Sequence, residues 1–121
     1  MEKRVTEADK VVELDVGGEC SGFKVSRSLL TSVPGSALEA LFSGRHPVEK
    51  IDNRVFIDRN PVIFREVINY LRNDFKLSKR VLNDEYLFDE VITDLEYWGL
   101  IDKSQPQNMP IFEDKAALMQ K

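Results

Sequence analysis

The run Val55–Arg72 constrains the fold of this chain more than any other stretch, because an apolar burst is joined through a proline to a periodic segment. The residues Val55–Ile57 are β-formers in a burst too short for a helix, so we expect a strand there. Asn60 can cap the next element. Pro61 suits its first helical position, because proline presets φ and lacks an N–H that would have no intrahelical partner there. The sequence therefore predicts a strand, a turn and a helix in that order.

Beyond the proline, apolar residues recur at the spacing of one helical face, and polar residues take the other face. This pattern predicts a half-buried helix. The expected buried face comprises Ile63, Phe64, Val67, Ile68 and Leu71, and the expected solvent face comprises Arg65, Glu66, Asn69 and Arg72.

A hairpin is predicted before this run. Val11–Val16 alternates in the manner of a half-buried strand, with Asp15 on the face opposite the apolar residues. A pair of glycines then breaks the strand. The short segment Phe23–Val25 can return as the second strand of a hairpin.

Two serines mark short helices after the hairpin. Ser26 can cap a helix that ends near Val33, because Pro34 disfavours helical geometry in the residue before it. Ser36 and Glu39 form a capping box for a second helix.

A second amphipathic stripe predicts the last helix. Asn83 or Asp84 begins it, its apolar face ends at Trp98, and Gly99 supplies a left-handed stop. We therefore divide the chain into a flexible leader over residues 1–10, one domain over 11–101, and a polar linker with a C-terminal tail over 102–121. The tail is either disordered or docks onto a partner or a neighbouring subunit.

Charge and hydropathy exclude several classes of partner. A net charge of −4 argues against nucleic acid, and the densest basic group, Lys76, Lys79 and Arg80, has no interleaved aromatic residues and is interpreted as part of a solubilising loop. No apolar run approaches the roughly 20 residues of a membrane span, so we expect no membrane insertion. The first ten residues lack the apolar core of a secretory signal. We expect a cytoplasmic protein.

Residues that could carry chemistry are few and isolated. His46 is the only histidine and Cys20 the only cysteine, so neither a catalytic pair nor a structural zinc site is indicated. The glycine-rich turn after the first strand lacks the phosphate-loop pattern and leads into a strand instead of a helix. We expect no catalytic, cofactor-binding or metal-binding residues, no cofactor, and no enzyme.

Three ordered blocks of the sequence resemble the potassium-channel tetramerisation domain, a branch of the BTB/POZ superfamily. The blocks are Leu14–Gly18, Ser26–Arg45, and the run from Val55 to Arg72. Two departures are visible. The family usually has two residues between the glycine pair and the aromatic residue of the second strand, whereas Glu19–Gly22 supplies four here, which predicts a longer hairpin tip. Asp15 stands where the family often has asparagine.

The resemblance implies an α+β (mixed α/β) fold of the BTB/POZ type, in which a short three-stranded sheet packs with several helices. It implies a homo-oligomerisation and protein–protein interaction module that acts as an assembly scaffold, with a homotetramer favoured over a homopentamer. The alternative is a substrate adaptor of a cullin-based ubiquitin ligase, with a cullin as partner.

The resemblance also places a polar subunit interface at or near Asp15, Arg27, Asp58, Arg59 and Asn60. The sequence gives an independent reason for part of this set. Asp15 lies opposite the apolar face of its strand, and Asp58 and Arg59 lie at the corner where the third strand ends, so none of them belongs in the core of a monomer. The plainer alternative is that the corner is a solvated turn.

Overall fold

The computed structural model describes residues 10–44, 50–51 and 54–102. The chain divides into two compact units that meet in sequence between Pro61 and Val62, and each unit is described by itself. The expected leader, apart from Lys10, and the tail from residue 103 onward lie outside the described residues. The elements in chain order are β1 (Val11–Val16), β2 (Glu19–Ser26), α1 (Arg27–Leu30), α2 (Ala37–Phe42), β3 (Lys50–Ile51), β4 (Arg54–Ile57), α3 (Pro61–Arg72), α4 (Lys79–Leu82) and α5 (Glu85–Tyr97).

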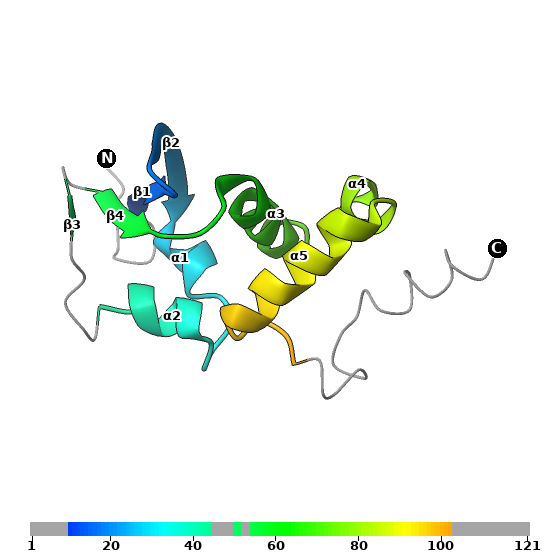
Figure 1. Cartoon of the computed structure of the whole chain (residues 1–121). Coiled ribbons are helices and arrows are strands. Elements are labelled where there is room, and N and C mark those ends of the chain that lie inside the picture. The colour runs from blue at the N-terminus through cyan, green and yellow to red at the C-terminus, as the bar shows by residue number, and fades with distance from the viewer. Residues whose placement is uncertain (1–9, 45–49, 52–53, 103–121) are drawn as a thin grey trace, which may run out of the picture. The chain divides into compact units, whose positions relative to one another are not determined.

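The first unit contains a four-stranded sheet with the strand order β2-β1-β4-β3 (Figure 1). The three expected strands are β1, β2 and β4, and the two-residue β3 adds an edge strand. β1 pairs antiparallel with β2 and parallel with β4. One face of the sheet forms the core of this unit. Its buried residues are Leu14, Val16, Phe23, Val25, Val55 and Ile57.

The hairpin between β1 and β2 is tighter than the sequence predicts. β2 begins at Glu19, which pairs with Val16, so the connection is the two residues Gly17 and Gly18. Both glycines have positive φ, 67° and 86°, as the two central residues of a type I′ hairpin turn require. The expected longer tip is therefore wrong: the four residues Glu19–Gly22, two more than the family usually has, belong to β2 and not to the turn.

Serine caps set the short helices of the first unit, as expected. Ser26 Oγ accepts a hydrogen bond from the Leu29 amide at 3.2 Å, and Ser36 Oγ accepts one from the Glu39 amide at 3.0 Å. α1 is shorter than predicted, because it ends at Leu30 and not near Val33. These caps satisfy backbone N–H groups that have no partner inside a helix.

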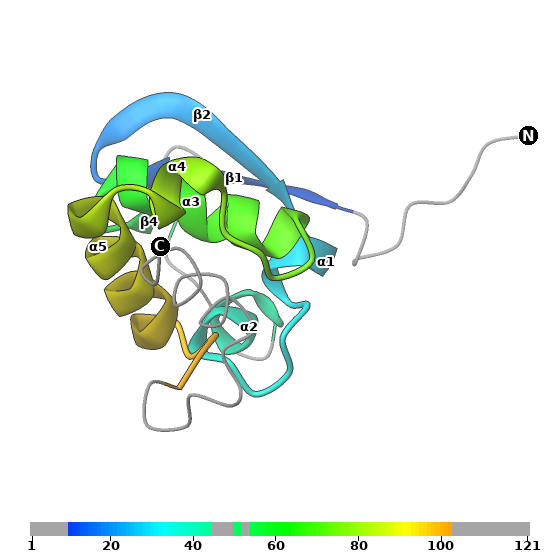
Figure 2. The same cartoon turned by 90° about the vertical axis from the view of Figure 1, so that its right-hand side faces the viewer.

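The predicted apolar face of α3 is buried, and that of α5 is buried from Val91 to Trp98 but only half-buried at Leu87 and Phe88. Phe64 is fully buried, and its ring lies edge-on to that of Trp98, with ring centroids 5.8 Å apart and an interplanar angle of 65°. Asp84 Oδ1 accepts a hydrogen bond from the Leu87 amide at 3.0 Å, which confirms the N-cap of α5. Figures 1 and 2 both show α4 beside the first turns of α5.

The end of α5 has the predicted left-handed stop. Gly99 has φ 74°. The Leu100 amide donates to the Leu95 carbonyl at 2.8 Å, and the Gly99 amide donates to the Glu96 carbonyl at 3.0 Å. This pair of bonds is the Schellman arrangement, in which a glycine just past the helix end lets the chain turn away.

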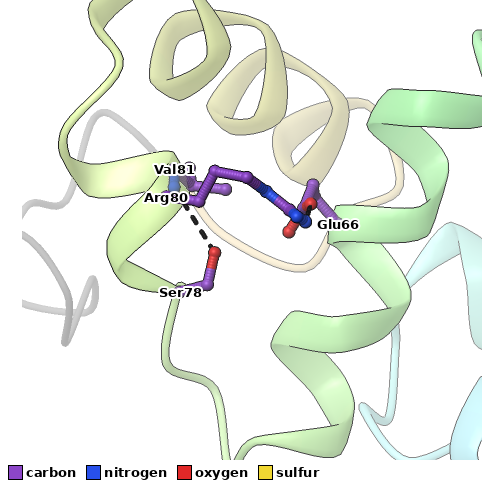
Figure 3. Close-up of polar contacts among 4 residues, drawn as sticks. All are labelled: Glu66, Ser78, Arg80 and Val81. Carbon is purple, nitrogen blue, oxygen red and sulfur yellow. Dashed lines mark hydrogen bonds and ion pairs between the residues drawn. The ribbon is translucent and has the colours of Figure 1, made fainter.

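Two expectations about the second unit are wrong. The basic stretch interpreted as a loop contains α4, which Ser78 caps and which buries Val81 and Leu82. Glu66, expected in solvent, is only 3% exposed and forms an ion pair with Arg80 of α4 (Figure 3). The physical reason is that α4, which is too short to show a helical period in the sequence, supplies Arg80. Its positive charge offsets the free-energy cost of burying the Glu66 carboxylate.

Each helix within the described ranges is too short, or too polar, to reach across a lipid bilayer.

Candidate functional site

Four of the five predicted interface residues gather at one edge of the sheet. β1 and β4 are parallel, and Val16 pairs with Ile57, so the carboxyl ends of both strands meet there. The Gly17 amide donates to the Ile57 carbonyl at 2.7 Å and ties the two ends together. Asp58 and Asn60 are exposed, whereas Asp15 and Arg59 are half-buried. We name the group Asp15, Asp58, Arg59 and Asn60 the charged corner.

Gly17 lets the charged corner lie against the hairpin turn. A Cβ atom on Gly17 would come 2.7 Å from the Arg59 carbonyl oxygen and 3.0 Å from Cδ of Pro61. The φ of 67° is also strained for any residue with a side chain. The backbone of the corner is therefore positioned by the first hairpin as well as by its own strand.

Arg27, the fifth predicted residue, lies at the opposite edge of the sheet. Its amide donates to the Lys10 carbonyl at 2.8 Å, which places it beside the start of β1. The six residues of β1 separate this position from the charged corner, a distance of about 20 Å at the rise of a strand. Arg27 Nη1 donates to the Phe42 carbonyl at 2.8 Å. A guanidinium at that position suits the negative end of α2, so Arg27 has a role inside the subunit.

A cavity of about 380 Å³ adjoins Arg27. It forms where β1 extends past β4, because the pairing of these strands begins only at Leu14 and Val55. We name this cavity the basic pocket. Its described lining residues are Lys10, Val11, Val12, Glu13, Arg27, Leu41, Phe42, Gly44, Lys50 and Val55.

The charge of the basic pocket is mainly positive. Lys10, Arg27 and Lys50 supply three cationic side chains, and Glu13 supplies the one carboxylate among the described lining residues. Glu13 Oε1 lies 3.5 Å from Nε of Arg54, which does not line the pocket. The sequence reasoning missed this cluster, because its three basic residues are far apart along the chain and only the sheet brings them together.

The outer face of the sheet carries an exposed aromatic side chain, which belongs to the short apolar segment that the sequence predicts as a strand. Phe56 is 42% exposed and pairs across the sheet with Asp15. An apolar ring therefore lies next to the charged corner.

In the part of the chain that the structure describes, no group of three or more His, Cys, Asp or Glu side chains could hold a metal ion. His46 and the side chain of Cys20 fall outside that part. The first unit offers three surface features: the charged corner, the basic pocket and the exposed ring of Phe56.

Comparison with known proteins agrees with a contact surface. Residues 12–107 match the family model of the BTB/POZ domain. Relatives include SH3KBP1-binding protein 1 of Bos taurus, Rattus norvegicus and Mus musculus, each 35% identical over 92 residues. The match covers 75% of this chain and 12% of each relative, so the chain spans about an eighth of the length of these relatives.

BTB/POZ domains associate with one another and with other proteins, and the family is a non-enzymatic interaction module. The matched range includes the hairpin from Val12 onward, the charged corner and α1 to α5. From its sequence blocks, its α+β fold and this match, the chain belongs to the BTB/POZ domain family, in the potassium-channel tetramerisation branch.

Proposed function

We propose that this chain is a homo-oligomerisation module that assembles its own copies into a closed ring and acts as a scaffold for the proteins bound to it. The observation that carries the proposal is the charged corner. Two carboxylates and a guanidinium are held at one edge of the sheet, away from the core residues on its buried face. Membership of a family that generally oligomerises supports the same reading.

A polar corner suits a ring for two reasons. Closed rings are built from heterologous contacts, in which each subunit offers two different complementary faces. Charged groups desolvated between subunits fix the register of the contact and reject wrong partners more than they add affinity. We favour four subunits over five.

Light scattering coupled to gel filtration tests the proposal directly. At tens of micromolar chain, we expect a mass that is four times that of one chain, or five times if the ring is pentameric. A mass equal to one chain at that concentration would refute the assembly function.

The charged corner can be tested by removing Arg59. Arg59→Ala should dissociate the ring and leave each subunit folded, because removing one partner of a desolvated charge pair costs about 2–5 kcal/mol of binding free energy. Arg72→Ala is the matched control, since it removes an equal charge from an exposed position at the end of α3. Circular dichroism reports folding and scattering mass reports assembly. If Arg59→Ala keeps the wild-type mass at low micromolar concentration, the corner is only a solvated turn.

The second candidate role is that of a substrate adaptor for a cullin-based ubiquitin ligase. It ranks lower, because no feature of residues 10–44, 50–51 and 54–102 singles out a cullin contact. Co-purification with a cullin would support the adaptor role. A pull-down without cullin from a preparation that keeps its oligomeric mass would leave the scaffold.

A further inference from the structure

The basic pocket reverses the charge of the chain locally. The whole chain carries a net charge of −4, yet three basic residues and one acidic residue are among those that line this cavity. The carboxylate, Glu13, lies beside Arg54. A concave site in which one sign of charge predominates attracts a group of the opposite sign, so an anionic group fits the basic pocket, and a carboxylate on a protein surface is such a group.

The charged corner is a surface of that kind. Asp58 is exposed in it, and the corner as a whole holds two carboxylates against one guanidinium. The pocket volume of about 380 Å³ equals that of roughly twelve water molecules, which leaves room for a short acidic side chain and part of its turn.

The pocket and the corner cannot meet within one subunit, because they lie at opposite edges of one sheet. Lys10 precedes β1 and Asp58 follows β4, and these strands are parallel. Two complementary surfaces at opposite edges are what a head-to-tail contact requires, and such a contact repeated around an axis closes a ring.

We infer that the basic pocket of one subunit receives the charged corner of the next, with Asp58 as the carboxylate that enters between Lys10 and Lys50. The inference rests on the proposed ring. It identifies the second of the two faces by which each subunit contacts its neighbours. It also explains why Arg27, expected at the interface together with the corner, lies some 20 Å from it: each belongs to a different half of the same contact.

A charge swap tests this pairing. Asp58→Lys and Lys50→Glu should each raise the dissociation constant of the ring at least tenfold, because each places like charges together. The double variant Asp58→Lys/Lys50→Glu restores the opposite charges at every contact of the ring, so its dissociation constant should return to within about threefold of wild type. Arg27 stays unchanged throughout, since it supports the end of α2.

Lys76 provides the matched control, because it is exposed, lies in the second unit and is absent from the pocket lining. Lys76→Glu should assemble as wild type, and Asp58→Lys/Lys76→Glu should remain dissociated. Rescue by Lys50→Glu without rescue by Lys76→Glu would establish the pairing. Equal rescue by both would mean that net charge alone matters, and would overturn it.

Other outcomes separate the inference from the proposed function. If circular dichroism shows that Lys50→Glu does not fold, Lys10→Glu takes its place in the same design. Wild-type mass for both lysine variants would mean that the pocket serves another occupant, which refutes the inference and leaves the ring intact. A monomeric wild type would instead refute the ring itself.

Discussion

At the scale of single residues, the absence of one side chain decides where the charged corner lies. Gly17→Ala should lower the free energy of unfolding by more than the roughly 1–2 kcal/mol that a left-handed backbone costs alanine, because its Cβ would also stand 2.7 Å from the Arg59 carbonyl oxygen. Urea denaturation measures the loss. Gly18→Ala is the control from the same turn: its φ is 86°, but nothing lies within 4 Å of the added Cβ. Equal losses in the two variants would show that the close approach to Arg59 carries no energy.

Single residues also mark what the sequence could predict. The charges at Asp15, Asp58 and Arg59 were recognisable as misplaced for a monomer's core, and the structure places all three at one edge. The burial of Glu66 could not be predicted, because a charged residue type alone places it on the polar face of its helix. It lies at helical spacing between Ile63 and Tyr70, both buried, and only the docked Arg80 reveals why a carboxylate is found there.

At the scale of elements, α4 is held by its contacts with the rest of its unit and not by its own helical propensity, since four residues cannot form a stable helix alone. Arg80→Ala should cost about 1–3 kcal/mol of unfolding free energy, because the buried carboxylate of Glu66 loses its cation. This is less than the 3–5 kcal/mol of a fully buried pair, because 66% of the Arg80 side chain is exposed and water screens the pair.

Lys79→Ala supplies the control within the same helix. Lys79 is exposed, and Lys79→Ala removes the same charge as Arg80→Ala. The free energy of unfolding should therefore change by no more than about 0.5 kcal/mol in the same urea titration. Equal effects of the two variants would mean that the ion pair of Figure 3 does not stabilise the fold.

The elements that could be predicted are those with a periodic pattern of apolar residues and a recognisable residue at the start or the end. β1, α3 and α5 repeat their apolar pattern over several residues and end at a glycine or begin at a polar cap or a proline. α4 is too short to show a period, and the first half of β2 has no alternation, so that its extent depends on pairing with β1 across the glycine turn. The basic pocket belongs to the same class of feature, since its three cations come from separate elements.

At the scale of the whole molecule, the proposed ring differs from a folding core in the kind of contact that holds it. The buried faces inside each unit are largely apolar, whereas the charged corner and the basic pocket are ionic. Assembly and folding should therefore respond differently to the same change of solvent.

Salt separates these two kinds of contact. Raising NaCl from about 0.1 M to about 1 M shortens the screening length from about 10 Å to about 3 Å, so the attraction between corner and pocket weakens. We expect the dissociation constant of the ring, from scattering mass against chain concentration, to rise about tenfold, which equals about 1.4 kcal/mol of association free energy. The circular dichroism spectrum should not change. A scattering mass that is unchanged or higher in 1 M NaCl would contradict an ionic contact. It would point instead to the exposed aromatic side chain of Phe56 as the group that subunits bury.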